Sequence, residues 1–379
     1  MSAAVSEARE PTRPPQAERK ILGVELLRIL SSIAVLVFHY HHFKFVGDAP
    51  VDFVRSQQPF YPLLALFYDS GFYGVEVFWC ISGFIFFWKY SRPLRDASLG
   101  GGAFFVLRLS RLYPLHFVTL IFMAAMQALY YSKVGSYFVY QYNDSFHFGL
   151  QLFMASNWGL QAGDSFNGPI WSISIEVLVY AVFFLSLRFV SRSAWFMGGI
   201  ALAAAAVQMS KLSTHPVFPC LMFFYLGCLT AIVYDQAGRT RQRQQAATAC
   251  AVLMIIALLG LGHFVDIKAK YFLVLFSPAL IYLCVTHIPS AGLAARILVP
   301  AGNMTYASYL LHVPVQIAIV TLGKFAGVAI PFHNAGFFLA YLAVILLLSH
   351  WTYVYFEMPA QKILRRTLMA RRSTAAAAA

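Results

Sequence analysis

The sequence predicts an all-α, polytopic integral membrane protein with about ten transmembrane helices. Of its 379 residues, 60% are hydrophobic and only 11% are charged, whereas about a quarter of an ordinary globular domain is charged. Ten apolar segments approach the length of about 20 residues that crosses a bilayer as a helix. This composition excludes a soluble enzyme, and we expect the lipid bilayer to surround most of the chain.

Each expected span is an apolar run bounded by charged residues, glycine or proline. In chain order the spans are 21–43, 70–89, 104–131, 168–190, 195–210, 217–234, 246–264, 271–288, 302–323 and 335–356. The loop 132–167 holds an apolar stretch that is too short to cross, so we expect it to cover the outer side as an interfacial or re-entrant segment. The expected domains are a disordered cytosolic tail (1–20), one transmembrane domain (21–360) and a basic cytosolic tail (361–379).

Basic residues outside the spans predict the orientation. Counted over alternate loops and tails, with basic residues at span ends included and Arg108 and Arg111 assigned to the loop before their span, 20 Lys and Arg lie on one side of the membrane and 7 on the other. Cytosolic loops carry the excess, and an even number of spans puts both ends on one side, so both termini are expected in the cytosol. The same placement explains the net charge of +13 without a nucleic-acid partner. The five cysteines lack the spacing of a zinc site, and we expect no bound metal.

Four of the seven glutamates lie within or at the edge of a span, although all eight aspartates lie in loops. A charged side chain at the bilayer centre costs about 2.5 kcal/mol or more, so an ionisable group there is a functional candidate. A structural ion pair, or a side chain that extends to the interface, is the alternative for each. The four are Glu25, Glu76, Glu176 and Glu357.

The first span carries Arg28 and His39 eleven residues apart. This spacing is three helical turns plus about 20°, so both side chains share one helix face, roughly 16 Å apart along the axis. Glu25, one turn before Arg28, is expected to pair with it. The stripe predicts a polar cavity through the membrane, whereas His41 and His42 beyond it are expected to be solvated.

A histidine that acts as a base needs a partner that fixes its tautomer and raises its basicity. Glu76 in the second span and Glu176 in the fourth are expected at about the depth of His39, and either could serve. In the second span Ser82 and Gly83 interrupt the apolar run. A role in the functional site would explain these two residues, and close helix packing through small residues explains them equally well.

Arg108 and Arg111 lie one turn apart at the cytosolic start of the third span. Two guanidinium groups at this spacing can clamp phosphates, which arginine binds bidentately. The local sequence alone favours a simpler alternative, in which the two arginines only anchor the span by the positive-inside rule.

Six segments, taken in order, resemble the acyltransferase family 3 membrane proteins, which O-acylate sugars of bacterial surface polysaccharides and some small natural products. The segments are ELLRILSSIAVLVFH, GVEVFWCISGF, RLSRLYPLH, WSISIE, SYLLH and YFEMP, from Glu25 to Pro359. Glu25 and Glu76 stand where the family more often has aspartate. The residues that match family elements are Arg28 with His39, Arg108 with Arg111, Trp171 and Ser172 with Glu176, and the late histidine His312.

The resemblance implies an acyltransferase without a bound cofactor, whose donor substrate is acyl-CoA, most simply acetyl-CoA. Arg108 and Arg111, helped by Arg28, would hold the CoA phosphates on the cytosolic side, and the pantetheine arm would extend toward His39. His39 would act as general base on the acceptor hydroxyl or would itself be acylated, and the sequence leaves both open. Glu76 and Glu176 are expected to assist. The expected supporting residues are Glu25, Ser82, Trp171, Ser172, His312 and Glu357.

The acceptor is expected to be a carbohydrate, such as a unit of a surface polysaccharide or exopolysaccharide. The protein would then lie in a bacterial inner membrane, with polysaccharide export machinery as a partner. The alternative is a multi-span transporter or permease, because buried Arg, Glu and His also mark substrate and proton pathways. The lack of an internal repeat and the concentration of ionisable residues in the first four spans count against it.

Overall fold

The computed structural model describes residues 20–265 and 268–377, with side chains described up to residue 369. Over these residues almost all regular structure is helical, which confirms the all-α prediction. The sheet in this part of the chain is a two-residue antiparallel ladder, in which Phe45 pairs with Pro50 and Val46 with Ala49. The expected disordered tail lies outside the described residues, apart from Lys20.

The elements fall into two halves of the chain. The first half comprises α1 (Leu22–Phe38), η1 (His39–Lys44), β1 (Phe45–Val46), β2 (Ala49–Pro50), η2 (Arg55–Gln57), α2 (Tyr61–Ser70), η3 (Gly71–Tyr73), α3 (Gly74–Arg95), α4 (Gly101–Val134), α5 (Ser145–Leu152), α6 (Ile170–Leu185) and the π-helix η4 (Ser186–Val190). The second half comprises α7 (Ala194–Met209), α8 (Val217–Ala237), α9 (Arg241–Phe264), α10 (Ala269–His287), α11 (Leu293–Asn303), α12 (Thr305–Ala326), α13 (Ala335–Trp351), the π-helix η5 (Thr352–Glu357) and α14 (Met358–Ala377).

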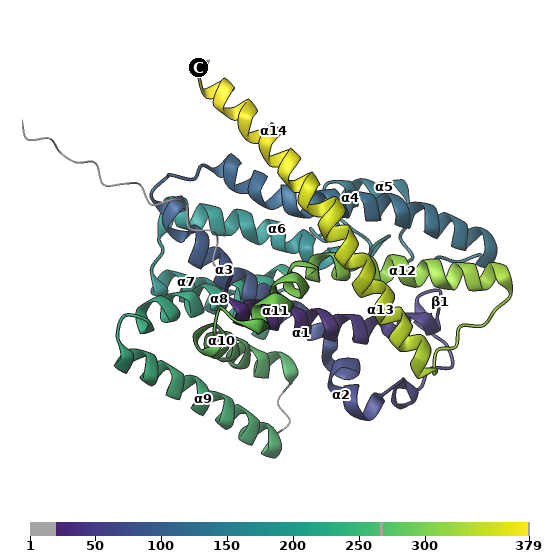
Figure 1. Ribbon diagram of the computed structural model, residues 1–379, viewed down its shortest axis with the longest axis horizontal. Helices are drawn as coiled ribbons and strands as arrows, with labels where there is room; N and C mark the ends of the chain where they lie inside the picture. The colour runs from purple at the N-terminus through teal and green to yellow at the C-terminus, as the bar shows by residue number, and fades with distance from the viewer. Residues whose placement is uncertain (1–19, 266–267, 378–379) are drawn as a thin grey trace, which may run out of the picture.

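Nine helical segments of the described chain are long and apolar enough to cross a membrane. They correspond to nine of the ten expected spans. The remaining span, expected at 195–210, is α7, whose 16 residues are somewhat short for a straight crossing. The last span continues through η5 into α14, so the segment after residue 360 extends the same helix, seen as the long yellow rod in Figure 1.

The two ends of the described chain lie at the same end of the bundle. Lys20, just before α1, donates a hydrogen bond to Asn303, just before α12. At the other end of the chain, Arg365 of α14 donates to the Ser110 hydroxyl of α4 at 3.3 Å. The starts of α1, α4 and α12 lie together around one cavity, described below. Both ends of the described chain therefore lie on one side, as an even number of membrane crossings requires.

The apolar core divides into two clusters along the length of the bundle. On α1 the division falls between Val35 and Leu36, and on α12 it falls between Leu310 and Val313. His312 lies at this division and is completely buried. A polar group at the centre of the bundle is expensive to bury, so its position points to a functional role.

Helices α3 and α8 pack with their backbones in direct contact through two glycines. A Cβ added at Gly83 would lie 1.8 Å from the carbonyl oxygen of Phe224, and one at Gly227 would lie 1.9 Å from that of Cys80. The small residue at 83 therefore serves helix packing, as the alternative interpretation proposed. Its neighbour Ser82 is held at a fixed depth in the bundle.

A proline in the central helix α12 leaves one backbone carbonyl without its helical hydrogen bond. Pro314 has no N–H, so the carbonyl of Leu310, four residues earlier, has no helical donor. The side-chain amide of Asn167 donates to this carbonyl at 3.0 Å. The loop before α6 is thereby tied to the middle of α12, next to His312.

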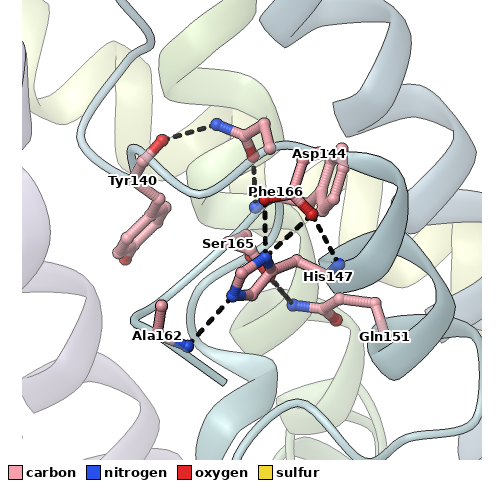
Figure 2. A network of polar contacts seen from close by, with 8 residues as sticks. Tyr140, Asp144, His147, Gln151, Ala162, Ser165 and Phe166 are labelled. Carbon is pink, nitrogen blue, oxygen red and sulfur yellow. Dashed lines mark hydrogen bonds and ion pairs between the residues drawn. The ribbon is translucent and has the colours of Figure 1, made fainter. Parts of the chain in front are cut away.

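Residues 136–169 form a cover over one end of the bundle that we call the outer cap, after the side of the membrane on which the sequence predicts it. Its helix α5 has eight residues and is too short to cross, as predicted. Asp144 caps this helix by accepting the N–H of His147 at 2.9 Å. The His147 ring donates from Nδ1 to the Asp144 carboxylate at 2.9 Å and accepts the Ala162 N–H at Nε2, 3.1 Å away (Figure 2). The hydrogen bonds from His147 hold the pKa of Asp144 below its ordinary value.

Further bonds close the outer cap on itself. The Gln151 side chain donates to the Ser165 carbonyl at 2.8 Å, and the Asn143 side-chain oxygen accepts the Phe166 N–H at 2.6 Å. Figure 2 shows the bond of Gln151 to Ser165, with Phe166 beside them. Together with the bond from Asn167 to α12, they make the cap a firmly held lid at the end of the bundle opposite the chain ends.

Large apolar side chains cover the outside of the bundle. Trp195 is 92% exposed, and Leu253 on α9 and Leu347 on α13 are also exposed. Helix α9 lies at the margin of the molecule in Figure 1. Helices satisfy their own backbone hydrogen bonds, so such apolar surfaces suit contact with lipid.

Candidate active site

A cavity of about 160 Å³ lies between α1, α3, α4, α6 and α12. This volume is roughly ten times what one buried water needs. Most of its other lining residues are aromatic or aliphatic, so a few polar groups converge in an apolar pocket, as in many ligand sites. Six residues predicted for the site line it: Arg28, Ser82, Arg108, Arg111, Ser172 and Glu176.

Arg28 is held in the cavity wall from two sides. Its Nη1 donates to Glu25 Oε2 at 3.0 Å, which confirms the expected pair, and its Nη2 donates to Thr305 Oγ1 at 2.9 Å. Lys20 Nζ lies 3.7 Å from the other oxygen of Glu25. Burial lowers the pKa of Lys20, and the positive charges of Arg28 and Arg111 lower it further. The mouth of the cavity is therefore crowded with cations.

Arg108 and Arg111 both line the cavity from α4, but they differ in their bonding partners. The Arg108 guanidinium lies 4.8 Å from the ring centroids of both Phe86 and Tyr90 and donates to the Tyr90 hydroxyl. In the described part of the chain, the Arg111 guanidinium has no hydrogen-bond or ion-pair partner. An arginine that keeps its donors unsatisfied beside a pocket is well prepared to bind an anion.

Glu176 enters the same cavity from α6. Ser82 and Tyr180 line the cavity together with Glu176, and their hydroxyls, like the charges of Arg108 and Arg111, act on its carboxylate. The carboxylate thus lies among polar groups that can orient it. Of the glutamates predicted to take part in catalysis, this is the one that the structure places in the cavity.

Glu76 and Glu357 lie outside the cavity lining. Glu76 is in the first turn of α3, and Lys270 at the start of α10 is the cation that acts on it. Glu357 is buried in η5, and its Oε1 has no hydrogen-bond partner within the described residues. Arg111 and Arg28 act on Glu357 electrostatically. Glu357 therefore offsets part of the positive charge of Arg111 and Arg28.

The segment around Trp171 and Ser172 fixes the start of α6 against α12. A 2.7 Å hydrogen bond joins the hydroxyls of Ser172 and Tyr309, and Tyr309 also donates to the Pro169 carbonyl at 2.9 Å. The Trp171 ring meets Trp79 edge to face, with centroids 5.7 Å apart. Both Tyr309 and Trp79 line the cavity. These two predicted supporting residues therefore hold parts of the cavity wall in place.

His39 lies beyond the cavity, toward the outer cap. Its Nδ1 is 2.9 Å from the carbonyl oxygen of Val35, one turn earlier. A carbonyl only accepts, so Nδ1 carries the proton and Nε2 keeps a lone pair. The structure differs here from the expected glutamate partner, since a backbone carbonyl sets the tautomer.

A row of rings connects His39 with the cavity. The ring of Tyr309, in the cavity wall, lies 5.9 Å from that of His312, which lies 5.0 Å from that of His39. Neither ring nitrogen of the buried His312 has a hydrogen-bond partner among the described residues. Unsatisfied buried donors and acceptors are costly. A polar ligand group or water beside His312 would remove that cost.

The expectation that His42 is solvated is wrong. The ring is 5% exposed, because η1 turns the chain beneath the outer cap and places His42 6.0 Å from the ring of Tyr140. His42 Nδ1 is 3.2 Å from the Gln316 side-chain oxygen, and the Gln316 amide donates to the His39 carbonyl at 2.8 Å. Gln316 thus bridges the two histidines. His41 is half-buried, with its ring 5.1 Å from that of Phe38.

Sequence reasoning identified His312 but missed the polar stripe on α12 to which it belongs. Thr305, Tyr309, His312 and Gln316 follow one another at spacings of four, three and four residues, so they share one face of the helix. This spacing can be read from the sequence and would have indicated the stripe. Arg365 was also missed, and no local pattern in the tail distinguishes it from the other basic residues there.

The fold and the site define a polytopic helical membrane protein with a cation-lined cavity inside its bundle. The chain belongs to the acyltransferase domain family Acyl_transf_3, which matches residues 21–354. It is similar to the acyltransferase MdmB of Streptomyces mycarofaciens, with 26% identity over 340 residues that cover 79% of each chain. No solved structure matches the chain. The protein is thus an integral membrane acyltransferase, and family membership decides against the transporter alternative.

Proposed function

We propose that the protein is an O-acyltransferase that moves an acyl group, most simply acetyl, from cytosolic acyl-CoA to a hydroxyl of a carbohydrate acceptor. The cavity with its unpartnered Arg111 is the observation that carries this proposal. CoA has phosphates at one end and a long, narrow arm that ends in the thioester. Three arginines at the mouth of a narrow, largely apolar cavity suit both parts of such a donor.

The donor enters from the cytosolic side in this proposal. Arg111 and Arg28 bind phosphate oxygens, while Arg108, held against the rings of Phe86 and Tyr90, keeps the entrance positive. The 20 to 7 division of basic residues supports a cytosolic location for both chain ends and for the cavity mouth beside them. The protein would then lie in a bacterial inner membrane.

His39 supplies the base for transfer. Its Nε2 lone pair accepts the proton of the acceptor hydroxyl as the hydroxyl oxygen bonds to the thioester carbon. The carbon–sulfur bond breaks, and the CoA thiolate leaves and takes up the proton from His39. Tyr309 and His312 lie between the cavity and His39 and line the path of the acyl group. If transfer passes through acyl-histidine instead, the same Nε2 forms the bond to the acyl group.

The acceptor would reach His39 from the side of the outer cap. The acceptor class proposed is a carbohydrate, such as a unit of a surface polysaccharide or exopolysaccharide, and the proposed partner is polysaccharide export machinery. Aromatic and histidine side chains surround this end of α1, among them Tyr140 and His42. Such flat, partly polar surfaces suit a sugar ring.

Equilibrium binding of acetyl-CoA to the purified full-length protein tests the donor site. We expect binding by wild type, weakened by Arg111→Gln and unchanged by Arg296→Gln, an exposed arginine of α11 that serves as the control. Absence of binding to wild type would refute the proposed donor. Mass spectrometry of surface glycans from a deletion strain, complemented with wild type or His39→Ala, tests the acceptor class, and unchanged glycan acylation would refute it.

A further inference from the structure

A second hollow, of about 840 Å³, lies on the other side of α3 from the donor cavity. The ends of α3 and α8 and the linker into α7 form it. It shares no lining residue with the donor cavity, and the adjacent residues Phe86 and Phe87 of α3 line one hollow each. We call it the arginine cleft; the residues that characterise it are Trp88, Arg92, Arg192, Trp195, Asp235 and Arg239.

The arginine cleft has a surplus of positive charge. Arg239 lies 3.4 Å from Asp235, the acid that lines the cleft, so these two charges offset each other. Arg92 and Arg192 are exposed and have no ion-pair partner within the part of the chain that the structure describes. Two arginines that line one hollow and have no acidic partner of their own among the described residues form a site for an anion.

The tryptophans place the arginine cleft at the level of the lipid headgroups. Trp88 and Trp195, which line the cleft, are 47% and 92% exposed. Tryptophan concentrates at the membrane–water interface, where its ring meets both apolar and polar surroundings. The cleft lies at the ends of the apolar helices α3 and α8, where headgroups begin. An anion bound there has lipid as its nearest source.

We propose that the arginine cleft binds the phosphate of an anionic phospholipid headgroup. Basic pockets between membrane helices on the cytosolic side recognise such headgroups. More arginines follow on the same end of the bundle and strengthen the positive field: Arg95, Arg188, Arg241 and Arg243. The inference does not rest on the acyl donor or the acceptor, because none of its residues lines the donor cavity.

Lipid binding to the detergent-purified full-length protein provides the test, counted by native mass spectrometry during titration. The probes are phosphatidylglycerol, zwitterionic phosphatidylcholine and, in a separate arm, inorganic phosphate. We compare wild type with Arg92→Gln/Arg192→Gln. A third protein, Arg92→Lys/Arg192→Lys, keeps the positive charge at both positions. The matched control is Arg296→Gln/Arg366→Gln, two exposed arginines at the same end of the bundle but outside the cleft.

We expect wild type to bind phosphatidylglycerol at least about tenfold more tightly than phosphatidylcholine, as fits two juxtamembrane charges. The glutamine pair should lose this preference, whereas the lysine pair and the control pair should keep it. Equal binding of phosphatidylglycerol by wild type and the glutamine pair would overturn the proposal. Displacement of the lipid by millimolar inorganic phosphate would also overturn it, because the ligand would then be a soluble phosphate compound.

Discussion

Replacing Gly83 by alanine tests how closely α3 and α8 must approach. The new Cβ would lie 1.8 Å from the carbonyl oxygen of Phe224, at least about 1.6 Å nearer than an ordinary contact of 3.4 Å or more. A helix backbone cannot rotate away as a side chain can, so the helices must separate. Overpacking costs about 1 to 3 kcal/mol, and a clash between two backbones belongs near the upper value. Alanine's better helix propensity offsets about 1 kcal/mol, which leaves a net loss of about 2 kcal/mol.

Thermal unfolding of the detergent-purified protein, followed by size-exclusion chromatography, measures this loss. We expect Gly83→Ala to lower the Tm by roughly 4 °C or more. Transfer activity should fall further than stability, because the neighbouring Ser82 lines the cavity together with Glu176. Gly199→Ala on α7 is the control, since its Cβ would meet open space. If Gly83→Ala unfolds at the wild-type temperature, the close backbone contact between α3 and α8 is not real.

Three further changes test the site and its cover. Changing Arg108 and Arg111 to lysine keeps the charge but removes bidentate binding, so the KM for acyl-CoA should rise about tenfold while the acceptor KM stays near wild type. If the double lysine variant binds acyl-CoA as tightly as wild type in an equilibrium assay, these residues have only an anchoring role. His39→Ala should insert and purify normally yet lose about 10² to 10⁴-fold in transfer rate, and activity above about a hundredth of wild type would contradict its role as base. Asp144→Ala removes the cap of α5 at a cost of about 1 kcal/mol, so hydrogen exchange in 145–152 should quicken. Asp144→Asn keeps a capping oxygen and should exchange like wild type; equal exchange in the two variants would count against the cap.

Local sequence information predicted the features that depend on one helix. The spans follow from runs of apolar residues, and the pair of Glu25 with Arg28 follows from their spacing on one helix face. Arg108 and Arg111 were recognised in the same way, and the structure brings them into one cavity with Glu176. The span expected at 195–210 is also a helix, although it has only 16 residues.

Features that depend on several elements could not be predicted. The burial of His42 results from the turn of η1 beneath the outer cap and from its bond to Gln316, a residue 274 positions away. The tautomer of His39 depends on how its ring is placed at the end of α1, where the Val35 carbonyl accepts both the backbone N–H and the Nδ1–H of His39. Neither apolar periodicity nor charge spacing contains such information, since both describe one segment at a time.

The contact of α14 with α4 has a consequence for the biogenesis of the enzyme. Arg365 bonds to Ser110, although the ribosome makes the two residues 255 positions apart. Arg365 also acts electrostatically on Arg108 and Arg111, so α14 contributes to the charge at the cavity mouth. A nascent chain that has inserted its earlier helices therefore still lacks the positive charge that α14 adds there. The residues that line the cavity end with Tyr309 of α12, so the wall is made first, and the charge that Arg365 adds beside Arg108 and Arg111 arrives only once synthesis has passed α13.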